Sequence, residues 1–278
     1  MSGRRLCGLP GTVEAGTAPL YEASQEEDAA FESGSEEDQA VTCSLIQFGM
    51  GAAPSWAPVT GFASLLAGYR SDKLVTVVGG VATGWGDLSG NGVNLTSSAG
   101  PTYSAVGGVN GLPKLSQSGN GNSKYLSNTS FVIVPDNDIE IFAVATPSST
   151  GNASGAYLCD LGANNDAILL EASVTNLVIY NGSLFNFGSA TATDPFCADC
   201  YNDGTSDSFG ILNGGTVQSG TIGTASQAST TLTIGNYEGL GDGWQGDIYE
   251  LWICGAKQSA SARAAWLEYV SARYGIAT

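Results

Sequence analysis

The 278-residue chain contains no histidine, so it lacks the commonest general base and the commonest metal ligand of enzymes. Charged residues are scarce at 13%, with 9 basic side chains against 26 acidic ones. The formal net charge of −17 disfavours nucleic acids and anionic membrane surfaces as partners, because both are polyanions. We therefore expect no nucleic-acid partner.

Long apolar runs are also absent. None reaches the roughly 18 residues of a membrane span, and Arg4 and Arg5 precede Leu-Cys-Gly-Leu-Pro-Gly rather than the apolar stretch of a secretory signal. We expect neither membrane insertion nor a signal peptide, and we expect the six cysteines to be reduced thiols. Cys197 and Cys200 have the spacing of half a zinc site, but no second Cys-x-x-Cys completes it.

The acidic residues gather at the start of the chain. Nine of them fall before residue 40, within a Gly-, Ser- and Ala-rich segment that is too poor in apolar side chains to fold alone. Residues 1–45 are therefore predicted to form an acidic, extended N-terminal arm, followed by a connector over residues 46–64. The expected assembly contacts of the arm are its few large apolar side chains: Leu9, Leu20, Tyr21 and Phe31.

The rest of the chain, residues 65–278, consists of strand-length apolar runs separated by turn residues. The predicted strands are 74–78, 80–85, 131–134, 139–145, 156–161, 167–172, 176–180, 208–212, 231–234 and 247–253. Residues 62–69 are expected to be a short helical turn or irregular. Ser259 as N-cap and Gly275 as left-handed terminator predict one helix over 259–274. This pattern indicates an all-β, two-sheet antiparallel sandwich with a short C-terminal helix.

Three groups of sequence motifs follow one another along the chain. The first group is Tyr69-Arg-Ser-Asp72 and Trp85-Gly-Asp-Leu-Ser-Gly-Asn-Gly92, and the second is Pro101-Thr-Tyr103 with Gly108-Val-Asn-Gly-Leu-Pro113. The chain closes with Gly246-Asp-Ile-Tyr-Glu250 and a helix that ends in Tyr-Gly-Ile. Over residues 65–278 the chain resembles the laminin-G-like branch of the concanavalin A-like lectin/glucanase superfamily. The resemblance implies a jelly-roll sandwich; such domains bind glycans, hydrolyse them or pack into assemblies, including bacteriophage virions.

The catalytic members of this superfamily carry Glu-x-Asp-x-Glu on one strand, since two carboxylates must flank a glycosidic bond. The nearest pattern here is Asp136-Asn-Asp138-Ile-Glu140, which lacks the first Glu and follows a proline. Asp247 and Glu250 would face opposite sides of a strand, and the resemblance suggests structural hydrogen bonds for them. No catalytic residue is predicted, and we expect no enzymatic activity.

Two kinds of ligand site remain as candidates. Calcium, the one cofactor considered, would be held by an acidic loop containing Asp199, Asp203 and Asp207, because oxygen ligands in a flexible loop suit this ion. A sugar would stack on aromatic side chains in loop-like segments, and the candidates are Trp244, Tyr237 and Tyr201. Packing beneath the sheet edge is the competing interpretation for Trp244.

These observations favour a non-enzymatic virion structural protein, a phage capsid decoration or a fibre or tail surface module anchored by its N-terminal arm. Its expected partners are other virion proteins, such as a capsid or tail subunit, and further copies of itself, and its expected location is the virion surface. The alternative is a lectin-like, carbohydrate-binding module that recognises a host surface glycan. A glycoside hydrolase is the third hypothesis.

Overall fold

The computed structural model describes residues 57–117, 124–132, 138–148, 156–162, 167–170, 176–180, 183–203, 207–221, 230–237 and 243–278. The chain divides into two units, Met1–Gly49 and Met50–Thr278, and every described residue belongs to the second. The predicted arm, with Leu9, Leu20, Tyr21 and Phe31, therefore lies outside the described residues, and its anchoring role stays a prediction. Within the described ranges, no helix is long and apolar enough to cross a membrane.

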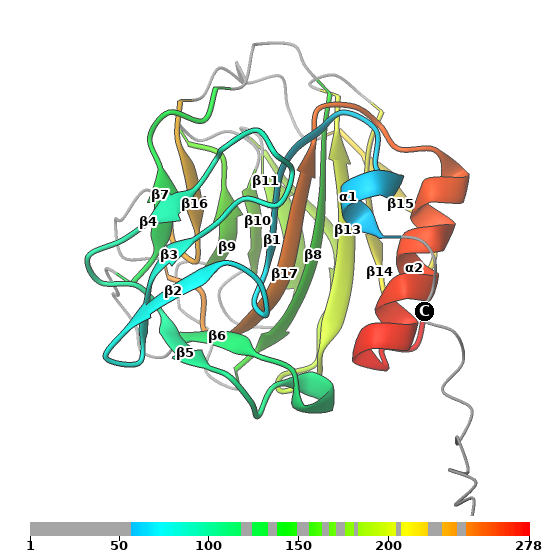
Figure 1. The fold of residues 1–278 in the computed structure, drawn as a ribbon. Coiled ribbons are helices and arrows are strands. Elements are labelled where there is room, and N and C mark those ends of the chain that lie inside the picture. The colour runs from blue at the N-terminus through cyan, green and yellow to red at the C-terminus, as the bar shows by residue number, and fades with distance from the viewer. Residues whose placement is uncertain are drawn as a thin grey trace, which may run out of the picture. The chain divides into compact units, whose positions relative to one another are not determined.

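The second unit is an antiparallel β-sandwich (Figure 1). Its first layer is built around the pairings of β17 with β1, β6 and β8, and of β8 with β13. In chain order its strands are β1 (Leu65–Arg70), β5 (Thr102–Ser104), β6 (Lys114–Gln117), β8 (Ile139–Pro147), β13 (Phe196–Asn202), β14 (Ser208–Leu212), β15 (Gln218–Gly220) and β17 (Gly246–Cys254).

The second layer contains the remaining strands and is joined to the first where β3 pairs with β5. Its members are β2 (Val75–Val78), β3 (Val81–Trp85), β4 (Leu95–Thr96), β7 (Leu126–Asn128), β9 (Ala156–Asp160), β10 (Ala167–Leu170), β11 (Asn176–Tyr180), β12 (Leu184–Ser189) and β16 (Leu232–Ile234). Three helical segments complete the described elements: α1 (Pro58–Gly61), the short 3-10 helix η1 (Val109–Gly111) and α2 (Ala260–Tyr274).

Strand β8 shows why the centre of the first layer is apolar on both faces. Ile141 and Ala143 point into the core between the layers, whereas Phe142 and Val144 belong to a second cluster under helix α2. Because side chains alternate along a strand, a strand covered on both sides must be apolar at nearly every position. All but one of the residues of β8 are buried.

Helix α2 covers the outer face of the first layer (Figure 1). The Ser259 side chain accepts a hydrogen bond from the backbone N–H of Ala262 (3.1 Å), and Gly275 ends the helix in the left-handed conformation at φ 68°. Trp266 and Val270 on its inner side are fully buried. The predicted helix and both of its terminal signals are confirmed.

The segment Trp85–Gly92 ties β1 to the loop that follows β3. The Asp87 carboxylate accepts hydrogen bonds from the backbone N–H groups of Gly68 (3.0 Å), Ser89 (2.8 Å) and Val93 (3.1 Å). The Asn91 side-chain amide donates to the carbonyl of Leu65 (2.8 Å). This sequence motif therefore specifies the fold and offers no free carboxylate to a ligand.

The structure corrects three of the predicted segments. Residues 62–69 contain strand β1. A strand is expected at 131–134, but residues 131 and 132, the two that are described, are not in a strand. Residues 196–202, predicted as part of an acidic loop, form β13, which lies between β8 and β14 with every residue buried. Asp199 and Asn202 suggested a loop, but both are buried polar side chains of a central strand.

Candidate functional site

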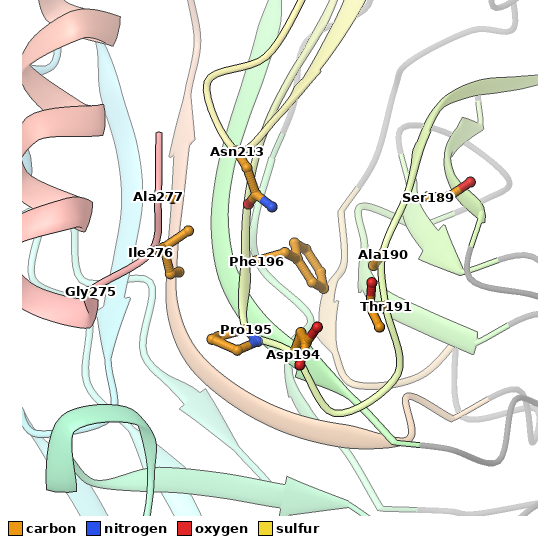
Figure 2. A pocket seen from close by; sticks show the side chains of 10 residues that line it. All are labelled: Ser189, Ala190, Thr191, Asp194, Pro195, Phe196, Asn213, Gly275, Ile276 and Ala277. Atoms are coloured by element: carbon orange, nitrogen blue, oxygen red, sulfur yellow. The ribbon is translucent and has the colours of Figure 1, made fainter.

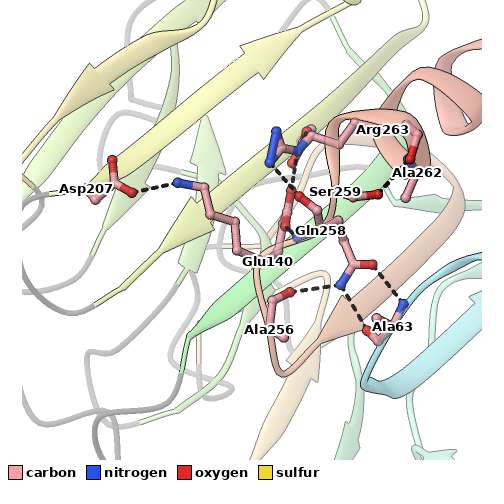
Figure 3. A network of polar contacts seen from close by, with 11 residues as sticks. Ala63, Glu140, Asp207, Ala256, Gln258, Ser259, Ala262 and Arg263 are labelled. Atoms are coloured by element: carbon pink, nitrogen blue, oxygen red, sulfur yellow. Dashed lines mark hydrogen bonds and ion pairs between the residues drawn. The ribbon is translucent and has the colours of Figure 1, made fainter.

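Glu140, the one acid of the candidate catalytic pattern that lies on a strand, is fully buried under helix α2. The Arg263 guanidinium donates to its carboxylate from Nε (3.1 Å), and the backbone N–H of Gln258 also donates to it (Figure 3). The Gln258 side chain in turn bonds both backbone groups of Ala63, at 2.8 and 2.9 Å. This network fastens the start of the helix to the sheet, and Glu140 has no surface from which to reach a sugar.

Asp199 belongs to the same network. Its carboxylate lies 3.7 Å from Arg263 Nε and is almost completely buried. Burial raises the pKa of Asp199 well above its usual range, and the neighbouring Glu140 carboxylate raises it further. The two acids and Arg263 thus form a closed structural cluster.

The other acidic pair, Asp247 and Glu250, is also structural. Glu250 is fully buried and accepts hydrogen bonds from Trp252 Nε1 (2.6 Å), from the Tyr269 hydroxyl (3.0 Å) and from the Tyr274 hydroxyl. Asp247 pairs with Lys114 Nζ (2.9 Å). The expectation that the two acids face opposite sides is wrong, because a β-bulge between Ile248 and Glu250 places both on the outer face, where Asp247 contacts the hydroxyl of Tyr249. The predicted structural role of both acids is confirmed.

The candidate calcium ligands do not converge on one point. Asp199 is sequestered under α2, while the exposed Asp207 accepts from Lys257 Nζ (2.6 Å) and donates its backbone N–H to the Asp203 carboxylate (3.2 Å). Over the described ranges, no three His, Cys, Asp or Glu side chains are grouped closely enough to hold a metal ion. The expectation that Asp199, Asp203 and Asp207 share one loop is wrong, because Asp199 is in strand β13.

The Cys197-Ala-Asp-Cys200 pattern does not form half a metal site. Cys197 faces the cluster under helix α2, whereas Cys200 faces the core between the layers. Burial raises the pKa of Cys197 to about 12, so it is a neutral thiol at physiological pH. Both residues are buried, free cysteines that fill space in the strand.

Two of the three candidate sugar-stacking residues present no ring face to solvent. Trp244 is 0% exposed and packs edge-on against Phe196, with ring centroids 6.2 Å apart. Tyr201 is 3% exposed and contacts both the ring of Phe209 (centroids 5.3 Å apart) and the ammonium group of Lys257 (4.7 Å from the Tyr201 ring centroid). In the structure both side chains contribute to packing, which is the competing interpretation for Trp244.

Tyr237, the third candidate, has a different environment. It is half-buried and packs against Tyr157, with ring centroids 4.7 Å apart and an interplanar angle of 30°. Tyr157 and Tyr180 are also half-buried and cover Val178. Leu177 of the same strand points into the core, so by alternation these three tyrosines lie on the outer face of the second layer.

A polar pocket opens on the same outer face, where β7 pairs with β16. Leu126, Leu232 and Ile234 of these strands point into the core, so their neighbours point outward. The pocket has a volume of about 310 Å³ and is lined by one phenol and four aliphatic hydroxyl side chains: Tyr125, Ser127, Thr129, Thr231 and Thr233.

We call the four tyrosines and these four hydroxyl residues together the tyrosine face. Its aromatic residues belong to β9, to β11 and to the segments beside β7 and β16. These strands are adjacent in the order β7, β16, β9, β10 and β11. Four strand-to-strand steps of about 4.8 Å separate β7 from β11, so the face extends about 19 Å across the strands. Such a surface offers aromatic rings for stacking together with hydroxyl groups that both donate and accept hydrogen bonds.

The sequence identified only Tyr237 of this face. The strand prediction for 176–180 contained the signal for Tyr180, because alternation places it on the same face as Val178, opposite to Leu177. No comparable signal existed for Tyr125 and Ser127, since β7 is three residues long and follows a polar segment.

No protein-family profile matches the chain, and neither does the sequence of any curated protein. Solved structures do match it, at low sequence identity. Domain 4 of AbnA, a GH43 extracellular arabinanase from Geobacillus stearothermophilus, was solved in complex with arabinotriose; it has a TM-score of 0.51 and 17% identity, and the match covers 74% of this chain and 98% of that domain.

Two longer chains match over part of their length. A GH54 α-L-arabinofuranosidase has a TM-score of 0.54 and 14% identity over 76% of this chain, which spans 63% of the enzyme. The second is a structure of botulinum neurotoxin type C, a toxin whose cell entry depends on interaction with two ganglioside molecules. The match has a TM-score of 0.52 and 14% identity, and it covers 76% of this chain and 52% of that one. At these identities the likeness shows the fold alone: the chain is a β-sandwich of the kind found in these domains.

Proposed function

We propose that this chain is a lectin-like, glycan-binding module and that the tyrosine face is its binding surface. The observation that carries the proposal is the combination of four outward tyrosines with a hydroxyl-lined pocket on one sheet face. The AbnA domain solved with arabinotriose and the neurotoxin that depends on gangliosides support this choice over the virion role.

The chemistry of the face suits a neutral sugar chain. A phenol ring stacks on the apolar C–H side of a sugar ring at a low entropic cost, because a tyrosine has only two side-chain torsions to fix. The side chains of Ser127 and Thr129, which are not buried, can exchange hydrogen bonds with sugar hydroxyl groups in either direction. The length of about 19 Å across the strands favours an extended chain over a single ring.

Tyr237 provides the test, because two substitutions separate its ring from its hydroxyl. We expect Tyr237→Ala to weaken glycan binding by about tenfold, and Tyr237→Phe to bind nearly as well as the wild type, since stacking needs the ring. A glycan array identifies a ligand, with soluble arabinan and β-glucan as further probes, and calorimetry measures both variants.

Two results would contradict the proposal. The function is refuted if the wild-type chain binds none of these probes at millimolar sugar. Equal affinity of the wild type and Tyr237→Ala for a ligand would place the binding site away from the tyrosine face.

The virion surface role, the homo-oligomer and the lack of enzymatic activity remain predictions. The arm that would anchor the chain lies outside the described residues, and the similar structures lend no support to a capsid or tail partner. Glu140 speaks against one specific hydrolytic mechanism, because it is buried under α2 and already bonded to Arg263.

A further inference from the structure

We propose a second binding site, in the pocket between the loop before β13 and the end of helix α2, for a single neutral sugar ring. The pocket has a volume of about 280 Å³ and is lined by three segments that are distant in sequence (Figure 2). They are the loop from Ser189 to Phe196, the turn at Asn213 and the stretch Gly275–Ala277. This volume is at the lower limit for small-molecule sites, so it fits one ring rather than a chain.

The loop that carries Asp194 is held in a strained conformation. Thr193 has a φ of 71°, which is rare for a β-branched residue. Its backbone N–H donates to the carbonyl of Pro147 (2.8 Å), and the N–H of Asp194 donates to the carbonyl of Thr191 (3.2 Å). These bonds fix the loop, and the exposed Asp194 carboxylate is positioned at the pocket (Figure 2).

Asn213 supplies a hydrogen-bond donor of fixed orientation. Its side-chain Oδ1 accepts a hydrogen bond from the backbone N–H of Cys197 (2.8 Å), and its backbone N–H donates to the carbonyl of Cys197 (2.9 Å). With Oδ1 engaged, the Nδ2 group is left for a ligand, and Figure 2 shows it turned toward the side of the pocket where Phe196 lies. The pocket is therefore lined by a hydrogen-bond donor, Asn213 Nδ2, as well as by an acceptor, the Asp194 carboxylate.

This pairing selects the ligand chemistry. One hydroxyl of a sugar ring can donate to the Asp194 carboxylate while a different hydroxyl of the ring accepts from Asn213 Nδ2, and Pro195 and Ile276 flank the pocket with apolar surface. An anionic ligand would be repelled by Asp194 and by the net charge of −17. An ammonium group would satisfy Asp194 but would leave the Asn213 donor without an acceptor.

The pocket is separate from the proposed glycan-binding surface, because it shares no residue with the tyrosine face. It lies beside the C-terminal residues and the start of β13 in the first layer, whereas the tyrosine face belongs to the second. The two sites can thus be tested independently.

The experiment follows the ¹H–¹⁵N spectrum of the full chain, in which the Asn213 side-chain amide gives its own pair of signals. The probes are L-arabinose, D-galactose, D-glucose and D-mannose, each raised to tens of millimolar. We expect at least one sugar to shift these signals saturably, and Asp194→Asn to weaken that binding by about tenfold or more, because a hydrogen bond to a charged group is lost.

Two control variants make the outcome decisive. Glu268→Gln removes an exposed carboxylate on α2 outside the pocket and should leave the affinity unchanged, and so should Tyr237→Ala on the other layer. The proposal is overturned if no sugar shifts the Asn213 signals. It is also overturned if Asp194→Asn binds as tightly as wild type, or if Tyr237→Ala abolishes the shift; dispersed spectra of each variant establish that it is folded.

Discussion

Glu140 and Glu250, the two fully buried glutamates of the first layer, both face helix α2 and serve to hold it. A buried carboxylate without hydrogen-bond donors would lower the stability of the fold, and each of these two accepts hydrogen bonds from several donors. Burial raises the pKa of Glu250, while the hydroxyl of Tyr274 and the indole N–H of Trp252 oppose this shift. The role of both glutamates is therefore to hold helix α2 against the first layer.

The hydroxyl of Tyr274 allows a direct test of this role. Tyr274→Phe removes one hydrogen bond to the buried Glu250 carboxylate and leaves the ring in place. We expect the free energy of unfolding to fall by about 1.5–3 kcal/mol, the usual range for a hydrogen bond to a charged group. Urea denaturation measures it, with Tyr103→Phe as control, because the Tyr103 hydroxyl makes no hydrogen bond to the described residues. Equal losses in both variants would contradict the proposed role.

Asp199 predicts an unusual dependence of stability on pH. Its folded-state pKa is raised by burial and by Glu140, so above about pH 3.9 the unfolded chain releases a proton that the folded chain retains. This group therefore lowers the free energy of unfolding as pH rises toward its folded pKa. Asp199→Asn should gain stability over wild type by up to about 1.4 kcal/mol per pH unit in that window.

Urea titrations of both proteins from acid to neutral pH measure this difference. Asp207→Asn serves as a control for the removal of one carboxylate, because its side chain is 70% exposed. If the Asp199→Asn curve ran parallel to that of the wild type, the raised folded-state pKa of Asp199 would be contradicted.

At the scale of elements, alternation and capping made most of the fold predictable. The strands β8, β9, β11, β14 and β17 and helix α2 lie where apolar runs and the Ser259 cap place them. The sequence failed at β13 because a central strand that touches both a helix and a buried acid cluster carries Asp199 and Asn202 at positions where apolar residues are expected. The ion-pair partner of Asp199, Arg263, is distant in sequence and lies on helix α2.

The candidate sites were less predictable than the elements. Trp244 and Tyr201 were selected as aromatics in loop-like segments, but whether a ring is exposed depends on the layer above it, which composition does not reveal. The tyrosine face gathers residues from positions 125 to 237, and the pocket at Asp194 gathers residues from 189 to 277. Such residues come together only through the register of paired strands and through the positions at which loops end, and neither can be read from the sequence alone.

At the scale of the whole molecule, the net charge of −17 decides which glycans can approach. A neutral chain meets no long-range force, whereas an acidic polysaccharide is repelled over the Debye length, about 30 Å at 0.01 M ionic strength and 3 Å at 1 M. We expect affinity for a neutral glycan to be constant over this range of salt. Any binding of an acidic glycan such as polygalacturonate should be weaker and should strengthen as salt is added. Affinity electrophoresis or calorimetry at both salt concentrations measures this, and tighter binding of polygalacturonate at low salt would show that a local basic surface, rather than the overall charge, governs recognition.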